Sequence, residues 1–119
     1  MGFAVKEPYL LKNYYWTGGT VLAEFYLHHR ESEDIDLFSE NEVAVEAISN
    51  IDFNYYPFPR INLGENWKGL AIDSLEDIAV NKVHTLFMKP RSRDFVDLYF
   101  ILKLTKKTWR NFFLTWQNL

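Results

Sequence analysis

The sequence contains no cysteine. This absence excludes disulfide bonds, a thiolate nucleophile and zinc sites built on thiolates. An excess of basic residues is also missing, because 13 lysines and arginines face 16 aspartates and glutamates and the net charge is -3. Such a chain has no overall positive field with which to hold nucleic acid, so any contact with nucleic acid must be local.

Long apolar runs are absent too. No stretch approaches the length of a transmembrane helix, and Lys6, Glu7 and Pro8 stand where a signal peptide would need apolar residues. Lys6 also spoils the myristoylation pattern that Met1 and Gly2 suggest. We therefore expect a cytoplasmic protein with no membrane partner.

Repeats, low-complexity segments and linker-like stretches are not found either, so we expect a single domain over residues 1–119. Hydrophobic residues make up 48% of the chain and aromatic residues 18%. This is ample for a core, and more than so short a chain can hide. Part of the apolar surface is expected to meet a partner.

A glycine pair, Gly18 and Gly19, breaks the chain before Thr20, which stands where a helix N-cap would be. Apolar residues at helical spacing then predict a helix over residues 21–29. Glycines let an anion approach the backbone at the start of a helix, where the dipole favours negative charge, so one interpretation is phosphate binding. The other is a tight turn without a ligand, and a lone glycine pair is weak evidence for the first.

Strict alternation over residues 34–38 predicts a strand that carries Asp34 and Asp36 on one face. The two carboxylates then lie roughly 6–7 Å apart. They repel each other by about 2–3 kcal/mol at an effective dielectric constant of about 20. A divalent cation held by oxygen ligands would relieve this repulsion. In the alternative, both aspartates face water at an edge strand, where screening weakens the repulsion.

A second alternating segment, residues 51–55, predicts another strand, and this strand carries Asp52. Asp52 would be a third carboxylate of the same site if the two strands are neighbours. A surface or turn aspartate is the alternative. Residues 42–49, between the two strands, predict a short acidic helix.

Two longer helices follow. A capping box at Ser74 opens the first, and Lys82 lies close to its apolar face. A lysine there needs an anionic partner or a route to solvent, unless it merely flanks the apolar stripe. The second helix follows a basic loop that ends in Arg93, and it carries Asp94 and Asp97 in its first turn. The helix dipole alone explains these aspartates, and Arg93 can pair with either.

The chain ends in an aromatic helical stripe, with rings at i, i+3, i+4 and i+7: Trp109, Phe112, Phe113 and Trp116. Such a stripe belongs either to the core or to an interface with a partner. The histidines do not form a metal site by sequence, because the adjacent His28 and His29 diverge by about 100° on a helix. His84 stands alone and is interpreted as a packing or surface residue.

Four segments in this order resemble the motifs of a known family: T-G-G-T-V-L, R-E-S-E-D-I-D-L-F-S, S-L-E-D-I-A-V-N-K and R-D-F-V-D-L-Y-F-I-L. The glycine pair with Thr20, followed after thirteen residues by D-I-D-L-F, is similar to the signature of polymerase-β-like nucleotidyltransferases. More narrowly, the four segments resemble the AbiEii-type nucleotidyl transferase toxins of bacterial abortive-infection and type IV toxin–antitoxin systems. The match runs from Tyr14 to about Lys103.

The resemblance implies an α+β (α/β) fold, a minimal polymerase-β-like nucleotidyltransferase with a small mixed sheet flanked by helices. It implies an enzyme that uses Mg²⁺ or Mn²⁺ to move a nucleoside monophosphate from an NTP to a hydroxyl on RNA, such as tRNA, or on protein. A cognate antitoxin would be a further partner.

The resemblance also implies roles for single residues. Asp34, Asp36 and Asp52 would hold two metal ions and support catalysis together with Lys82. Two such ions, about 3.5–4 Å apart, stabilise both the attacking and the leaving oxygen of an in-line displacement. Lys82 would also help to bind the nucleotide, together with the other motif residues: Gly18, Gly19, Thr20, Arg93, Asp94 and Asp97.

The chain departs from this family in length and in one motif. Members are generally longer, with further strands between D-I-D-L-F and the third carboxylate, and Pro90 stands where an arginine is expected before R-D-F-V-D. The C-terminal helical region is shortened as well, which leaves the aromatic stripe to be covered by a second copy in a homodimer. The alternative to an enzyme is a catalytically degenerate nucleotidyltransferase-fold module that binds and acts through a partner or by self-association.

Overall fold

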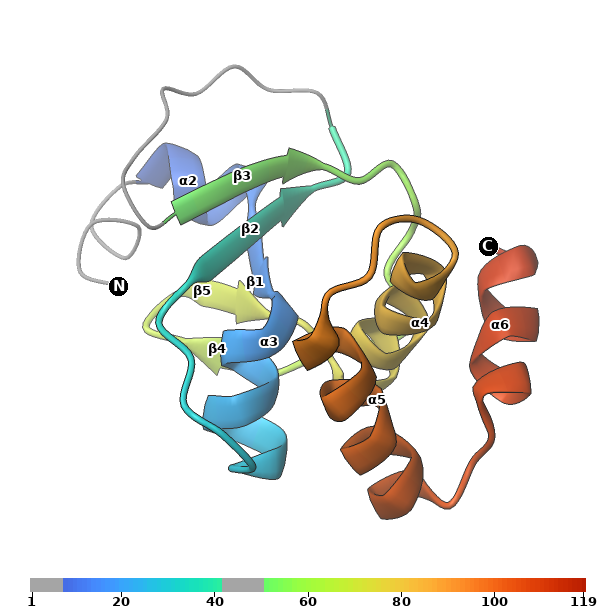
Figure 1. Cartoon of the computed structure of the whole chain (residues 1–119). Helices are drawn as coiled ribbons and strands as arrows, with labels where there is room; N and C mark the ends of the chain where they lie inside the picture. Colours follow the sequence, from blue (N-terminus) through green and yellow to red (C-terminus); the bar gives the residue numbers. More distant parts are fainter. Residues whose placement is uncertain (1–7, 42–50) are drawn as a thin grey trace.

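A computed structural model of the chain describes residues 8–41 and 51–119 (Figure 1). A five-stranded mixed sheet is flanked by helices, so the α+β fold class expected from the sequence is confirmed. The helix predicted over residues 42–49 lies outside the described residues. No helix in the described ranges has both the length and the apolar character needed to cross a membrane.

The sheet has the strand order β3-β2-β1-β5-β4. Its strands are β1 (Tyr15–Thr17), β2 (Ile35–Ser39), β3 (Ile51–Tyr55), β4 (Asn66–Trp67) and β5 (Leu70–Ile72). The β1 strand is antiparallel to β2 and parallel to β5, while β2 and β3 are parallel. The two alternating segments predicted as strands are therefore β2 and β3, and they are neighbours.

The N-terminal helices differ from the sequence-based expectation. After α2 (Pro8–Asn13) and β1, the chain enters α3 (Gly18–Val21), which continues as the π-helical segment η1 (Leu22–Leu27). The prediction that Thr20 caps this helix is wrong, because the helix already begins at Gly18. Gly18 has a φ of 86°, which L residues rarely adopt, and so the chain passes from strand to helix with no intervening turn.

The C-terminal half holds α4 (Leu75–Leu86), α5 (Ser92–Thr105) and α6 (Trp109–Gln117), which gather on one side of the molecule (Figure 1). The predicted N-cap of α4 is confirmed, because the hydroxyl of Ser74 accepts a hydrogen bond from the backbone N–H of Asp77 at 3.0 Å. Apolar side chains from the sheet and these helices form one core, which includes Leu37, Leu70, Ile72, Ile78, Val83, Ile101 and Phe112.

The aromatic stripe of α6 is largely covered within the chain itself. Phe112 is buried, and the ring of Trp116 stacks on His84 of α4 with 4.5 Å between centroids. Of the four stripe residues only Trp109 is exposed. His84 is therefore a packing residue, and the stripe does not need a second copy of the chain to cover it. The homodimer stays a prediction without support from this face.

Candidate functional site

Three aspartates form what we call the acidic edge: Asp34, Asp36 and Asp52. Asp36 in β2 and Asp52 in β3 are direct partners in the parallel register, so the predicted proximity of these carboxylates is confirmed. Asp34 comes one residue before β2 and is exposed, as is Asp52, whereas Asp36 is half-buried. The structure thus brings together two of the predicted carboxylates on adjacent strands, with the third close by in sequence.

The negative charge of the acidic edge is only partly offset by nearby cations. Burial, and then the charge of Asp52, raise the pKa of Asp36, although Lys82 and Arg91 act in the opposite direction. Asp34 has a cationic neighbour, since Nη1 of Arg93 lies 3.4 Å from its Oδ2, but both groups are exposed to solvent. A contact of this kind contributes little to stability.

The donor set of the acidic edge suits a hard divalent cation, because carboxylate oxygens are the ligands that Mg²⁺ and Mn²⁺ prefer. Burial and the charge of Asp52 both raise the pKa of Asp36, and a cation bound nearby would act against both effects. In the ranges that the structure describes, however, no three His, Asp or Glu side chains converge closely enough to hold a metal ion. The chemistry therefore fits a metal, whereas the convergence of three ligands is not present.

The glycine pair lies against charged side chains. A Cβ added at Gly18 would overlap the carboxylate of Asp36, and one added at Gly19 would overlap the guanidinium of Arg30. Gly18 is favoured by its positive φ of 86°, and a side chain at either position would displace the end of Asp36 or Arg30. Gly18 connects this pair to the acidic edge, because Asp36 lies directly over it.

Thr20, the third predicted residue of the glycine motif, is buried and bonded within the chain. Its hydroxyl lies 2.6 Å from that of Ser32 and also donates to the backbone carbonyl of Asp34. These bonds fasten α3 to the segment that leads into β2. Thr20 thus positions Asp34, and its hydroxyl is already engaged.

Lys82 is buried and has two acidic partners. Its ammonium donates to Oδ1 of Asp94 at 2.9 Å and lies 2.8 Å from Oδ2 of Asp97. The expectation that Lys82 needs an anionic partner is confirmed, and the partners come from α5. Asp94 also accepts a hydrogen bond from the backbone N–H of Arg91 at 2.8 Å, which caps α5.

Asp97 is the centre of what we call the buried ion network: His29, Arg30, Lys82, Asp94 and Asp97. Nε2 of His29 lies 2.6 Å from Oδ1 of Asp97, and Arg30 donates to both carboxylate oxygens at 2.7 and 2.9 Å. Burial alone would raise the pKa of Asp97, but hydrogen bonds from Arg30 and Lys82 outweigh it and hold the pKa far below its usual range. The network joins the end of η1 to α4 and α5.

His29 and Arg30 are the members that sequence reasoning missed. Both follow the helix that begins at the glycine pair, and their partner Asp97 is 67 residues from Arg30. The adjacency of His28 and His29 bears only on a shared metal ion and does not indicate the contact between His29 and Asp97. A usable signal was the aspartate pair Asp94 and Asp97, because buried carboxylates need cations from elsewhere in the fold. Only Asp94 lies in the first turn, since α5 begins at Ser92, so the prediction that both do is wrong for Asp97.

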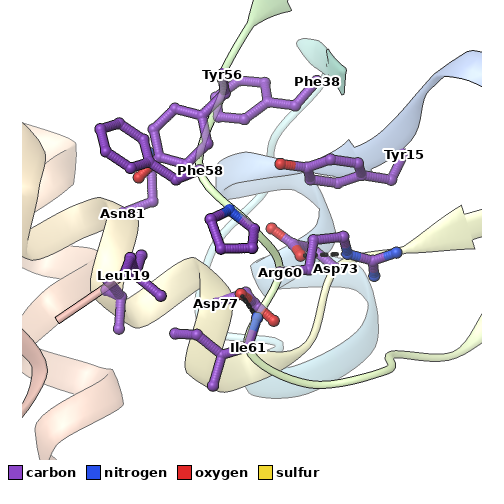
Figure 2. Close-up of a pocket in the computed structure, with 12 residues that line it drawn as sticks. Tyr15, Phe38, Tyr56, Phe58, Arg60, Ile61, Asp73, Asp77, Asn81 and Leu119 are labelled. Carbon is purple, nitrogen blue, oxygen red and sulfur yellow. Dashed lines mark hydrogen bonds and ion pairs between the residues drawn. The ribbon is translucent and has the colours of Figure 1, made fainter. Parts of the chain in front are cut away.

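A second buried carboxylate, Asp73, lies beside a narrow pocket between the sheet and α4 (Figure 2). Thr17 donates to it at 2.7 Å and Nε of Arg60 at 3.3 Å, while the guanidinium of Arg60 lies over the ring of Tyr15. Burial raises the pKa of Asp73 to about 7 and outweighs the opposing contacts with Thr17 and Arg60. The rings that line the pocket belong to Tyr15, Phe38, Tyr56 and Phe58. No sequence motif singled out this cluster.

Comparisons of the chain with protein-family models, with characterised proteins and with solved structures gave no match. What bears on function is therefore the sequence motifs together with the geometry of the acidic edge, the glycine pair and the buried ion network.

Proposed function

We propose that the chain is a metal-dependent nucleotidyltransferase of the AbiEii type, which transfers a nucleoside monophosphate from an NTP to a hydroxyl on RNA or on a protein. The observation that carries the proposal is the in-register pair of Asp36 and Asp52, with Asp36 directly over Gly18. Adjacent carboxylates beside a glycine-rich helix start are what a site for a metal-bound triphosphate requires.

The acidic edge supplies the metal ligands in this proposal. Mg²⁺ or Mn²⁺ bound there would neutralise the triphosphate and polarise the phosphorus under attack. Asp36 gains most from such an ion, because burial and Asp52 disfavour its charged form in the free protein. The exposed positions of Asp34 and Asp52 leave both side chains free to turn toward an ion.

The chemical step is an in-line displacement at the α-phosphorus. The acceptor hydroxyl oxygen forms the new P–O bond while the bond to the β-phosphate oxygen breaks, and pyrophosphate leaves. The hydroxyl proton departs toward Asp52, whose side chain is exposed. Lys82 acts through its positive charge from behind the site, since its ammonium is held by Asp94 and Asp97.

A transfer assay tests the proposal. The protein is incubated with each radiolabelled NTP, with Mg²⁺ or Mn²⁺, and with tRNA or cell extract as acceptor. We expect label on an acceptor with the wild type and a loss of at least about 100-fold with Asp36→Asn or Asp52→Asn. Glu65→Gln removes the same charge at an exposed position outside the acidic edge and should retain transfer. Equal behaviour of the wild type and Asp36→Asn would overturn the proposal.

The second candidate is a catalytically degenerate module of the same fold that binds ligands and acts through a partner, such as an antitoxin, or by self-association. Two observations favour this module. The side chains of Asp36 and Arg30 lie against the glycine pair, and no three metal ligands converge in the described ranges. Calorimetric titration with Mg²⁺ and Mn²⁺, combined with the transfer assay, separates the two. Ion binding that Asp36→Asn abolishes is compatible with both, so transfer of label decides: ion binding without transfer favours the degenerate module, and transfer counts against it.

A further inference from the structure

Arg30 lies where the absence of a side chain at Gly19 makes room for it. A Cβ at Gly19 would overlap Nη2 of Arg30, so the guanidinium lies directly against the first turn of α3. Asp36 of the acidic edge lies over the preceding residue, Gly18, in the same way. The member of the acidic edge that acts on Arg30 is Asp34, whose negative charge favours the charged form of the guanidinium.

Asp97 fixes the orientation of this guanidinium. Nε donates to Oδ1 at 2.7 Å and Nη2 donates to Oδ2 at 2.9 Å, which is a two-point contact that sets the plane of the group. Asp97 is fully buried and is held in turn by Lys82 at 2.8 Å. Arg30 is thus presented by a carboxylate that has little freedom to move.

One edge of the guanidinium remains available. Asp97 occupies the edge formed by Nε and Nη2, and Nη1 makes only a long hydrogen bond of 3.3 Å to the carbonyl of Glu31. Among the described residues, no acceptor meets the outward N–H groups along the edge between Nη1 and Nη2. The Arg30 side chain as a whole is 20% exposed, so solvent reaches part of it. Two oxygens of a phosphate group match such an edge.

We propose that Arg30 binds a phosphate group of the nucleoside triphosphate with its free guanidinium edge, while Asp97 positions it from the other edge. The identity of the ligand rests on the proposed function. Gly19 then matters because it leaves room for Arg30 to lie against α3, with Asp34 of the acidic edge among the charges that act on the guanidinium. None of the roles implied by the sequence motifs includes Arg30.

Calorimetric titration with inorganic triphosphate in the presence of Mg²⁺ tests this inference without requiring transfer. Arg30→Lys keeps the positive charge but loses the planar guanidinium that can donate two parallel hydrogen bonds, and we expect roughly 10-fold weaker binding of triphosphate. Arg30→Gln loses both and should bind roughly 100-fold more weakly. Arg110→Gln on α6 removes an exposed guanidinium elsewhere and should leave the affinity unchanged within about twofold. Equal affinity of wild type and Arg30→Gln, or no binding by the wild type, would overturn the inference.

Thermal unfolding of the same variants separates a ligand contact from a structural role. A residue that only braces Asp97 would lower the melting temperature and leave the affinity for triphosphate intact, and that pattern contradicts the inference. Failure of the proposed function is visible separately. If binding depends on Arg30 but the wild type transfers no label, the phosphate contact stands and the transferase does not. If the wild type transfers label, and both Arg30 variants bind triphosphate and transfer label as the wild type does, the transferase stands and the phosphate contact of Arg30 does not.

Discussion

The buried ion network and the acidic edge are both built on aspartates, yet their charges are balanced differently. Asp97 is fully buried and has Arg30 and Lys82 as partners, which hold its pKa far below the usual range against the effect of burial. Asp36 is half-buried and faces a like charge, Asp52, in the parallel register, and its pKa is raised. The first group is compensated within the chain, whereas the second is compensated only in part.

This difference separates the roles of the two groups. A compensated buried network holds elements in place, and here it connects the end of η1 to α4 and α5 through Asp97. A pair of carboxylates that is only partly compensated costs stability in the free protein and gains it when a cation binds. The acidic edge is therefore where an external charge is wanted, and the network keeps the surrounding groups in position.

The largest expected effect is that of removing Asp97. Asp97→Ala leaves the buried ammonium of Lys82 with one of its two acidic partners and removes the two-point contact of Arg30. It should lower the free energy of unfolding by about 3–5 kcal/mol at neutral pH. Urea denaturation measures this. Asp34→Ala on the acidic edge removes only an exposed contact with Arg93 and should cost less than about 1 kcal/mol. Equal losses in the two variants would erase the distinction between the groups.

Asp73 is buried, as Asp97 is, but fewer contacts offset the cost of burying its charge. Its raised pKa therefore makes the free energy of unfolding depend on pH. Its pKa is about 7 in the folded protein against an ordinary value of 3.8, so the folded state favours the protonated form. The stability that this adds is fully present below pH 4 and is lost as the pH rises to about 7. Asp97 behaves in the opposite way, because a depressed pKa adds stability above its ordinary value that is lost toward acid.

Asp73→Asn should therefore flatten the decline between pH 4 and about 7, by an amount on the order of 2–4 kcal/mol over the range. Denaturation curves at several pH values for wild type and variant give the difference directly. Glu65→Gln, at an exposed position, serves as the control and should leave the pH profile as it is in the wild type. Parallel profiles for wild type and Asp73→Asn would show that Arg60 and Thr17 compensate Asp73 after all.

Two glycines test how closely Asp36 is confined. Gly18 and Gly69 both have positive φ, at 86° and 91°, but a Cβ at Gly18 would overlap the Asp36 carboxylate, whereas one at Gly69 meets only Leu11 at an ordinary 3.6 Å. Both alanine variants carry backbone strain of about 1–2 kcal/mol. Gly18→Ala should cost about 1 kcal/mol more than Gly69→Ala. Asp36→Ser in the Gly18→Ala background should recover that excess, and equal costs for the two glycines would contradict it.

The sequence predicted the elements whose signals are local. Alternation over residues 51–55 matches the bounds of β3, and the serine cap of α4 is observed at Ser74. Asp52 was one of two interpretations, a third carboxylate of the site if the two strands pair or a surface aspartate, and the register of β2 and β3 selects the first. Helix α5 was predicted from its acidic start, but it begins at Ser92, two residues before Asp94, and includes Arg93 of the predicted loop.

The rest depended on contacts that no local pattern reveals. Threonine is a residue type that often caps helices, which is why Thr20 was predicted as an N-cap. The helix instead begins at Gly18, which adopts a positive φ with Asp36 packed over it. The partner of Arg30 is 67 residues away, on a different helix. A sequence shows that a buried charge needs a partner but seldom shows which one, and so Lys82 was predicted to need an anion while Arg30 was passed over.

The smallest expected effect has the opposite sign to all the others. Asp36→Asn replaces one of two like charges that lie opposite each other on adjacent strands, and without metal it should raise the free energy of unfolding by about 0.5–1 kcal/mol at neutral pH. Adding Mg²⁺ should then stabilise the wild type and leave the variant unchanged, because stability rises only with a ligand that the folded state binds. Thermal unfolding with and without Mg²⁺ measures both. If Asp36→Asn destabilises the metal-free protein, Lys82 and Arg91 balance the charge of Asp36. The acidic edge would then be charge-compensated within the chain, as the buried ion network is.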